Sequence, residues 1–236
     1  MRSDRKSICF EDLKRRVLAL EIPPGAPLDE IALSESYGLS RTPLREVYQR
    51  LAGEGYISLE ANRGATVSSM DLSVMRSFFQ TAPLVYSAVA RLAAENGTAG
   101  QAEQLKQVQH RFRKAVRQNA FLEMSMLNHT FHELIGTMAG NPYLLPSLNR
   151  LLIDHTRMSH RFYRPLQEVG KQRVKLACDQ HDAMIAALEA GDAKRAADLT
   201  LQHWELSRSE IEKYVQPDPL PIDDVVRDAE KRADAV

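Results

Sequence analysis

The chain has 236 residues, of which 44% are hydrophobic and 26% charged, the composition of an ordinary globular protein with one large or two small domains. Basic and acidic residues number 31 each, so no excess of positive charge marks the chain as a nucleic-acid binder. No apolar run is long enough to span a bilayer, the opening MRSDRKS lacks the apolar core of a signal peptide, and two distant cysteines make no disulfide framework. We therefore expect a protein of the reducing cytoplasm with no membrane segment.

The first 40 residues predict two helices and a turn. Apolar residues recur at helical spacing over residues 10–21, and a Pro-Pro-Gly run then ends that helix. The stretch LDEIALSESYGLS predicts a short second helix, with Asp29 as its N-cap and a turn at Gly38. When a third helix follows such a turn, the pair forms a helix-turn-helix.

The third predicted helix lies in the stretch SRTPLREVYQRLAGEG and has the features of a helix that enters a DNA groove. Arg41, Arg45 and Gln49 fall on one face, one turn apart. The opposite face is apolar and consists of Leu44, Val47, Tyr48 and Leu51. Ser40 or Thr42 can cap the first turn, and two guanidiniums beside small hydroxyls suit phosphate and guanine. The alternative interpretation is a surface helix with a few solvated arginines.

The stretch GYISLEANRGATVS predicts a hairpin after that helix. Tyr56–Glu60 is one strand, Asn62–Gly64 the turn and Ala65–Ser68 the returning strand. Such a hairpin is a wing, and Arg63 at its tip can reach the DNA backbone or the minor groove. The residues that we expect to contact DNA are Ser40, Arg41, Thr42, Arg45, Gln49, Arg63 and Gly64.

These pieces occur in one uninterrupted order. The run PPGAPLDEIALSESYGLSRTPLREVYQRLAGEGYISLEANRGATV resembles the winged-helix regulators of the bacterial GntR family. The resemblance covers nearly all of residues 10–70 and is specific, because each motif appears at its expected place. It implies a winged helix-turn-helix domain whose partner is double-stranded DNA.

From residue 73 onward the periodic stretches are helical and no strand is predicted. The six helices expected are Val74–Asn96, Ala99–Gln118, Phe121–Ala139, a helix capped by Asn141 that runs to Arg161, Gln172–Ala190, and Ala193–Val215, which Asp192 caps. Past these helices the chain is proline-rich and acidic, as loose tails are. The predicted fold is therefore mainly α, with a winged helix-turn-helix domain over residues 1–70, an all-α bundle over 71–215 and a tail over 216–236.

Two histidines are predicted to lie at the same height on neighbouring helices. His181 lies ten residues before the turn at residues 191–192 and His203 eleven after it, so both are about 15–17 Å from that turn at a rise of about 1.5 Å per residue. Asn128 and His132 are four apart and share one face of a third helix. Side chains that converge in a bundle can hold a metal ion. The alternative is that they are separate surface or core histidines.

The sequence around these histidines resembles a known effector domain. The runs NHTFHELIGTMAGNPYL and QHDAMIAALEAGDAKRAADLTLQHWE resemble the FCD domain, which follows the winged domain in the FadR subgroup of GntR regulators, over about residues 75–213. In metal-binding members an Asp or Asn, a His four residues later and two further His bind a divalent ion. The resemblance implies that Asn128, His132, His181 and His203 bind such an ion, with zinc as the first choice and nickel or manganese as alternatives.

Two features depart from the pattern of that domain. Asn128 stands where Asp is commoner; its neutral carboxamide leaves the ion's full +2 charge, which favours a carboxylate effector. The Arg and Glu that many members carry on the first effector helix correspond to Ala82 and Tyr86. We therefore expect Tyr86 at the effector site and Arg157 or Arg161 in place of the missing arginine. The other histidines, His110, His129, His155 and His160, are expected to be solvated or simply packed.

Together these features predict a ligand-responsive, DNA-binding transcriptional regulator rather than an enzyme. We expect a homodimer on a palindromic operator, because one winged domain reads half of a palindrome. Repression is the commoner mode in the family the chain resembles. Two alternatives stay open: a metal-free sensor of an apolar ligand, and a metal-dependent hydrolase fused to a DNA-binding domain. The second would use the ion to activate water, but the motif offers no obvious general base.

Overall fold

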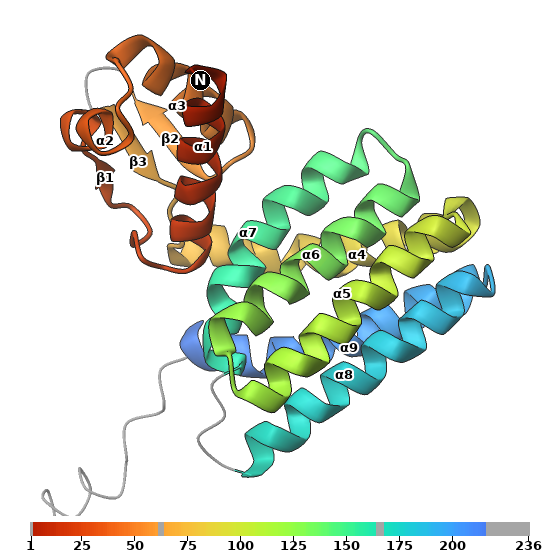
Figure 1. Ribbon diagram of the computed structural model, residues 1–236. Helices are drawn as coiled ribbons and strands as arrows, with labels where there is room; N and C mark the ends of the chain where they lie inside the picture. Colours follow the sequence, from red (N-terminus) through yellow and green to blue (C-terminus); the bar gives the residue numbers. More distant parts are fainter. Residues whose placement is uncertain (1, 61–63, 164–167, 216–236) are drawn as a thin grey trace, which may run out of the picture.

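The structure, a computed structural model, describes residues 2–60, 64–163 and 168–215 (Figure 1). Its first domain contains the elements α1 (Arg2–Leu18), β1 (Pro27–Leu28), α2 (Glu30–Tyr37), α3 (Arg41–Gly53), β2 (Ile57–Glu60) and β3 (Gly64–Val67). The three strands form an antiparallel sheet in the order β1-β3-β2, in which Pro27 pairs with Thr66 and Ile57 with Val67. The predicted helix-turn-helix and hairpin are thereby confirmed as parts of a winged domain.

Local signals explain the ends of the helix-turn-helix. The Asp29 carboxylate accepts hydrogen bonds from the backbone N–H groups of Ile31 and Ala32, at 2.9 and 3.0 Å, and so caps α2 as predicted. Gly38 ends α2 with a φ of 59°, the left-handed conformation that glycine adopts without steric cost. Two features were missed: α1 begins eight residues earlier than residue 10, and β1 is too short to show a period of two.

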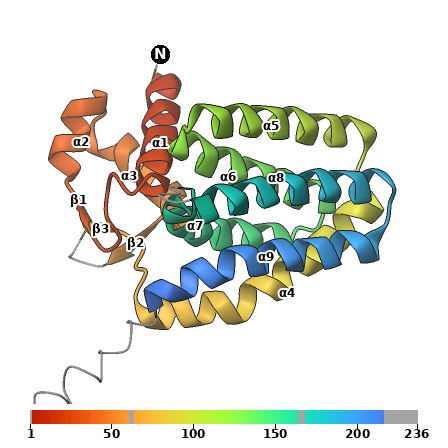
Figure 2. The same cartoon turned by 90° about the horizontal axis from the view of Figure 1, so that it is seen from below.

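The second domain consists of helices throughout the part of it that the structure describes. These are α4 (Leu72–Asn96), α5 (Ala99–Gln118), α6 (Phe121–Ala139), α7 (Leu144–Phe162), α8 (Glu168–Glu189) and α9 (Ala193–Val215). In Figure 2, α4 lies along α9, and α5 covers α6. The predicted caps are confirmed, because Asn141 accepts from the N–H of Leu144 and Asp192 from the N–H of Arg195. The mainly α fold with a winged domain is therefore as predicted.

The hydrophobic core has two parts, and α7 joins them. One cluster lies within the helical bundle, and the other lies between α1, α2, α3 and the sheet. Ile153 of α7 is fully buried, and it belongs to the second cluster although its helix belongs to the bundle. Figure 1 shows α7 at the side of the bundle that faces α1. Among the described residues no helix has the length and apolar character needed to cross a membrane.

Candidate metal centre and DNA-binding surface

Helix α3 presents its polar face to solvent. Leu44, Val47, Tyr48 and Leu51 are buried against the domain core, as the spacing predicted. Ser40, Arg41, Thr42, Arg45 and Gln49 are exposed together on the other face. Gly64, also exposed, begins β3 with a φ of 77°, and Arg63 lies outside the described residues. The predicted contact residues that the structure describes on α3 thus share one accessible surface.

The N-terminus of α3 lacks a side-chain cap. We expected Ser40 or Thr42 to cap this turn; Ser40 occupies the N-cap position, but no side chain makes a capping hydrogen bond there, so that expectation is wrong. Pro43 has no N–H to donate, so it adds no unpaired donor to the first turn, and Ser40 at the N-cap position is exposed. An uncapped helix N-terminus of this kind binds anions such as phosphate.

Arg45 is held by an acidic residue of the preceding helix. Its Nε donates to Glu30 Oε1 at 2.9 Å and its Nη2 to Glu30 Oε2 at 3.4 Å, a two-point contact between α3 and α2. Arg50 is different, since its guanidinium lies 3.7 Å from the centre of the Phe10 ring and pairs with Glu54. Arg45 is therefore engaged in an ion pair with Glu30 although its side chain is 66% exposed, whereas Arg50 packs against α1.

Three histidines from three helices converge inside the bundle. His132 on α6, His181 on α8 and His203 on α9 are all buried, and one ring nitrogen from each lies within 4.8 Å of the other two. The Nε2 atoms of His181 and His203 are 3.3 Å apart. The hairpin of α8 and α9 thus places these two rings at one height, as their distances from the turn predicted.

Two buried polar atoms of α6 lack hydrogen-bond partners. Nε2 of His132 and Oδ1 of Asn128, one turn earlier on α6, are buried and make no hydrogen bond within the described structure. Burial lowers the pKa of His203 to about 4 and holds the pKa values of His132 and His181 well below the usual range. All three imidazoles are therefore neutral at pH 7, and each brings a ring nitrogen to one small volume.

Packing and hydrogen bonds orient the rings. His181 stacks on Phe131 at a centroid distance of 4.1 Å, and its Nδ1 lies 3.0 Å from Oε1 of Gln109 on α5. Nδ1 of His203 lies 2.9 Å from Oε1 of Gln180 on α8. Sequence reasoning missed both glutamines; Gln109 could not be found because no spacing rule links α5 to α8 before the pairing of the helices is known.

Of the three residues expected at an effector site, one adjoins the histidines. The ring of Tyr86 stacks on His132 at 6.2 Å, and its hydroxyl is 3.1 Å from Nδ1 of His155, which is buried. Arg157 is fully buried, but it donates from Nη1 to the backbone O of Ser68 at 2.8 Å and pairs with Asp154 through Nη2. The side chain of Arg161 lies outside the described residues. Arg157 is therefore directed at the segment that joins the two domains.

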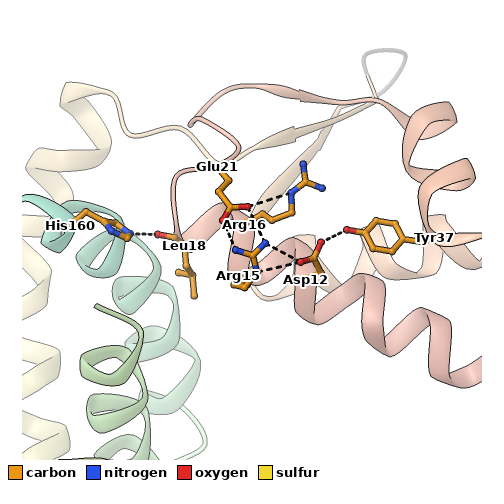
Figure 3. Close-up of polar contacts among 7 residues, drawn as sticks. All are labelled: Asp12, Arg15, Arg16, Leu18, Glu21, Tyr37 and His160. Carbon is orange, nitrogen blue, oxygen red and sulfur yellow. Dashed lines mark hydrogen bonds and ion pairs between the residues drawn. The ribbon is translucent and has the colours of Figure 1, made fainter. Parts of the chain in front are cut away.

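A second contact joins α7 to the winged domain. Figure 3 shows Nε2 of His160 at the backbone O of Leu18, the last residue of α1, at a distance of 2.7 Å. The same end of α1 is held by Arg15, which bonds Asp12 and Glu21. The other histidines not expected to bind metal divide as predicted into packed and solvated ones: His129 and His155 are buried, and His110 is exposed.

Comparison with known proteins agrees with this architecture. A family model described as "Bacterial regulatory proteins, gntR family" matches residues 8–67, and one described as "FCD domain" matches residues 84–206. The HTH-type transcriptional repressor RspR of Escherichia coli is 28% identical over 203 residues, which cover 85% of this chain and 86% of that protein. The Glc operon transcriptional activator of the same species is 26% identical, over 92% of this chain and 98% of that protein.

Solved structures show the same fold. E. coli McbR/YncC has a TM-score of 0.74 at 19% identity, over 90% of this chain and 99% of its own. A GntR regulator from Rhodococcus sp. RHA1 has a TM-score of 0.67 at 15% identity, over 91% of this chain and 100% of its own. The FCD match alone spans more than half of the 236 residues. The chain therefore belongs to the GntR family, as a transcriptional regulator with an N-terminal helix-turn-helix domain and a C-terminal FCD domain.

Proposed function

We propose that this regulator binds a palindromic DNA operator as a homodimer and responds to a small anionic effector through a divalent metal ion in its FCD domain. The DNA half of the proposal is supported by the exposed face of α3, where an uncapped N-terminus, Arg41 and Arg45 lie together. One such face covers a half-site, so a symmetric operator needs two copies of the chain.

The metal half rests on one observation: ring nitrogens of His132, His181 and His203 lie within 4.8 Å of one another, and Nε2 of His132 makes no hydrogen bond within the described structure. Nε2 of His132 and Oδ1 of Asn128 have no hydrogen-bond partner within the described structure, and a buried polar atom without a partner costs about 1–3 kcal/mol. Two further Nε2 atoms, those of His181 and His203, approach within 3.3 Å. A divalent cation removes this penalty, and three imidazoles with a carboxamide oxygen form a donor set that zinc, nickel or manganese accepts.

The donor set also indicates the effector. Three neutral imidazoles and the neutral Asn128 side chain leave a bound ion its full +2 charge, which attracts a carboxylate to a remaining coordination position. Tyr86, stacked on His132, is the side chain best placed to orient such a ligand. Arg157 is already committed to Ser68 and Asp154, so we assign the attraction to the metal centre rather than to an arginine.

Helix α7 supplies a route from this site to the DNA-binding domain. On one side His155 bonds the hydroxyl of Tyr86. On the other side Arg157 bonds Ser68 and His160 bonds Leu18. An effector that favours one placement of α7 would shift the placement of the two DNA-binding domains, provided that its affinity differs between the two arrangements. The relatives include both a repressor and an activator, and we propose repression as the mode here.

Metal analysis combined with ligand screening tests the proposal. Protein purified without chelators is expected to carry one divalent ion per subunit, and His181→Gln to lose it. His110→Gln, a change of the same kind at an exposed histidine of α5, is the matched control and should keep the ion. Light scattering should give a dimer.

A thermal-shift screen of small carboxylic acids should then stabilise the metal-loaded wild type and not His181→Gln, since ligands stabilise only the state that binds them. Effector and operator DNA should alter each other's affinity in mobility-shift titrations. If zinc, nickel and manganese all fail to bind the wild type, the metal reading is refuted, and a metal-free sensor of an apolar ligand takes its place.

A further inference from the structure

A buried glutamine outside the four proposed ligands holds His181 in a single orientation. Gln109 on α5 is 3% exposed, and its Oε1 lies 3.0 Å from Nδ1 of His181. Its Nε2 lies 2.9 Å from the backbone O of Cys178 and 2.9 Å from Oδ1 of Asp182. A backbone carbonyl never donates and a carboxylate only accepts, so the atom between them must be the amide nitrogen, which donates to both.

This arrangement fixes the proton on His181. Turning the Gln109 amide by 180° would set its oxygen against two other acceptors, so Oε1 must face the histidine. Oε1 can only accept, and Nδ1 of His181 is therefore the protonated nitrogen. A neutral imidazole carries one proton, which leaves Nε2 with a lone pair that points to His203. The ring is presented to the centre in the form that a metal ligand needs.

The support behind Gln109 reaches the protein surface. Asp182, on α8 one residue after His181, accepts from Gln109 through Oδ1 and pairs through Oδ2 with Arg113 of α5. Arg113 also contacts Asp179 at 3.4 Å. Each link joins α5 to α8, so the orientation of Gln109 is set by the packing of these two helices and not by the metal centre itself.

His203 has no comparable restraint. Gln180 is half-buried, and its amide makes no second hydrogen bond among the described residues. Either orientation of that amide is therefore acceptable, and His203 can carry its proton on Nδ1 or on Nε2. In the second form Nε2–H of His203 donates to the lone pair of His181 across 3.3 Å. The two histidines thus differ: one is fixed in advance, and the other adapts.

We infer that Gln109 is a positioning residue of the centre, which holds His181 as its Nδ1–H tautomer whether or not an ion is bound. The importance of this residue for metal affinity rests on the proposed function, but the tautomer does not. Removing such an outer partner typically lowers metal affinity about 10- to 100-fold. The same outer position is often filled by a carboxylate, and a neutral carboxamide here adds no negative charge beside the ligand.

The test measures the tautomer directly in metal-free protein. Long-range ¹H–¹⁵N correlation spectra of chelator-treated protein labelled with ¹⁵N-histidine distinguish protonated from unprotonated ring nitrogens, and His181→Gln assigns the signals. Wild type should show Nδ1–H on His181. Gln109→Met, similar in shape but without the amide oxygen, should populate the other tautomer. Gln104→Met, an exposed site on the same helix, is the matched control.

Zinc competition titrations supply the second readout. We expect Gln109→Met to bind zinc about 10- to 100-fold more weakly than Gln104→Met. An Nε2–H tautomer on His181 in the wild type would overturn the inference, and so would an unchanged His181 spectrum in folded Gln109→Met. If no metal binds even the wild type while its His181 is Nδ1–H, the proposed metal centre fails and the positioning by Gln109 stands. If metal binds the wild type but its His181 is the Nε2–H tautomer, the proposed metal centre stands and the positioning by Gln109 fails.

Discussion

The buried ion pair of α7 gives a prediction whose size can be worked out. The Arg157 side chain is fully buried and that of Asp154 is 5% exposed. Removing one partner of a buried pair costs about 3–5 kcal/mol, because the other charge is left in a medium that solvates it poorly. In Arg157→Met, Asp154 keeps Arg150 as a partner at 2.7 Å, with a side chain that is 38% exposed. The stability lost in this variant should therefore lie near the lower end of that range, at about 3 kcal/mol.

Calorimetry and urea unfolding measure this loss. For a chain of this length each 1 kcal/mol corresponds to about 2–4 °C, so the melting temperature should fall by about 6–12 °C. Arg111→Met, on the exposed face of α5, is the matched control and should stay within about 0.5 kcal/mol of wild type.

A double-mutant cycle separates the ion pair from simple packing. Asp154→Leu alone leaves Arg157 buried without its carboxylate and should also destabilise the protein. The double variant Arg157→Met/Asp154→Leu removes both charges, and its cost should be smaller than the sum of the single costs by about 1–3 kcal/mol. If the costs simply add, the reasoning from burial is refuted. A destabilisation below about 1 kcal/mol in Arg157→Met would refute it as well.

Three further outcomes follow from the geometry. Arg45→Ala should weaken specific DNA binding about tenfold or more. Glu30→Gln, which releases Arg45 from its ion pair, should tighten binding roughly two- to fivefold. In anisotropy titrations, a variant that binds the operator as tightly as wild type would contradict the prediction made for it. Burial lowers the pKa of His129 from 6.5 to about 4. The free energy of unfolding should therefore decrease as pH falls from 6.5 toward 4, by about 2 kcal/mol between pH 7 and 5. In chelator-treated protein, His129→Gln should remove this contribution of His129 to the pH dependence of stability. Burial raises the pKa of Cys9 and Cys178 to about 11, so native protein at pH 8 should resist thiol reagents that label it at once in urea.

Several helix boundaries could be predicted from the sequence because their signals are local. α5, α6 and α9 have the predicted bounds. Thr98 caps α5 through a hydrogen bond to the Gln101 N–H, and Gly140 ends α6 in the left-handed conformation. The ends of α1 and α8 were less accurate, since polar residues precede the first apolar turn of each helix and conceal where it begins.

Only the part of the candidate site that follows from distances along the chain could be predicted from the sequence. The meeting of His181 and His203 follows from equal distances to one turn, which the sequence shows. Gln109 and the destination of Arg157 depend on which helices pack together across long separations in the chain, and no periodicity carries that information. The role of Arg157 in effector binding remains a prediction, and the contacts of this side chain favour a role at the domain junction instead.

The spacing of residues on α7 explains how one helix can serve both domains. Ile153, Arg157 and His160 follow one another at i, i+4 and i+7, so they form one stripe, and all three contact the winged domain or its linker. His155 lies about 200° around the helix from Ile153 and contacts Tyr86 beside the histidine cluster. A rotation of α7 that relaxed one stripe would strain the other. A helix held on both faces is the kind of element that the coupling proposed above requires.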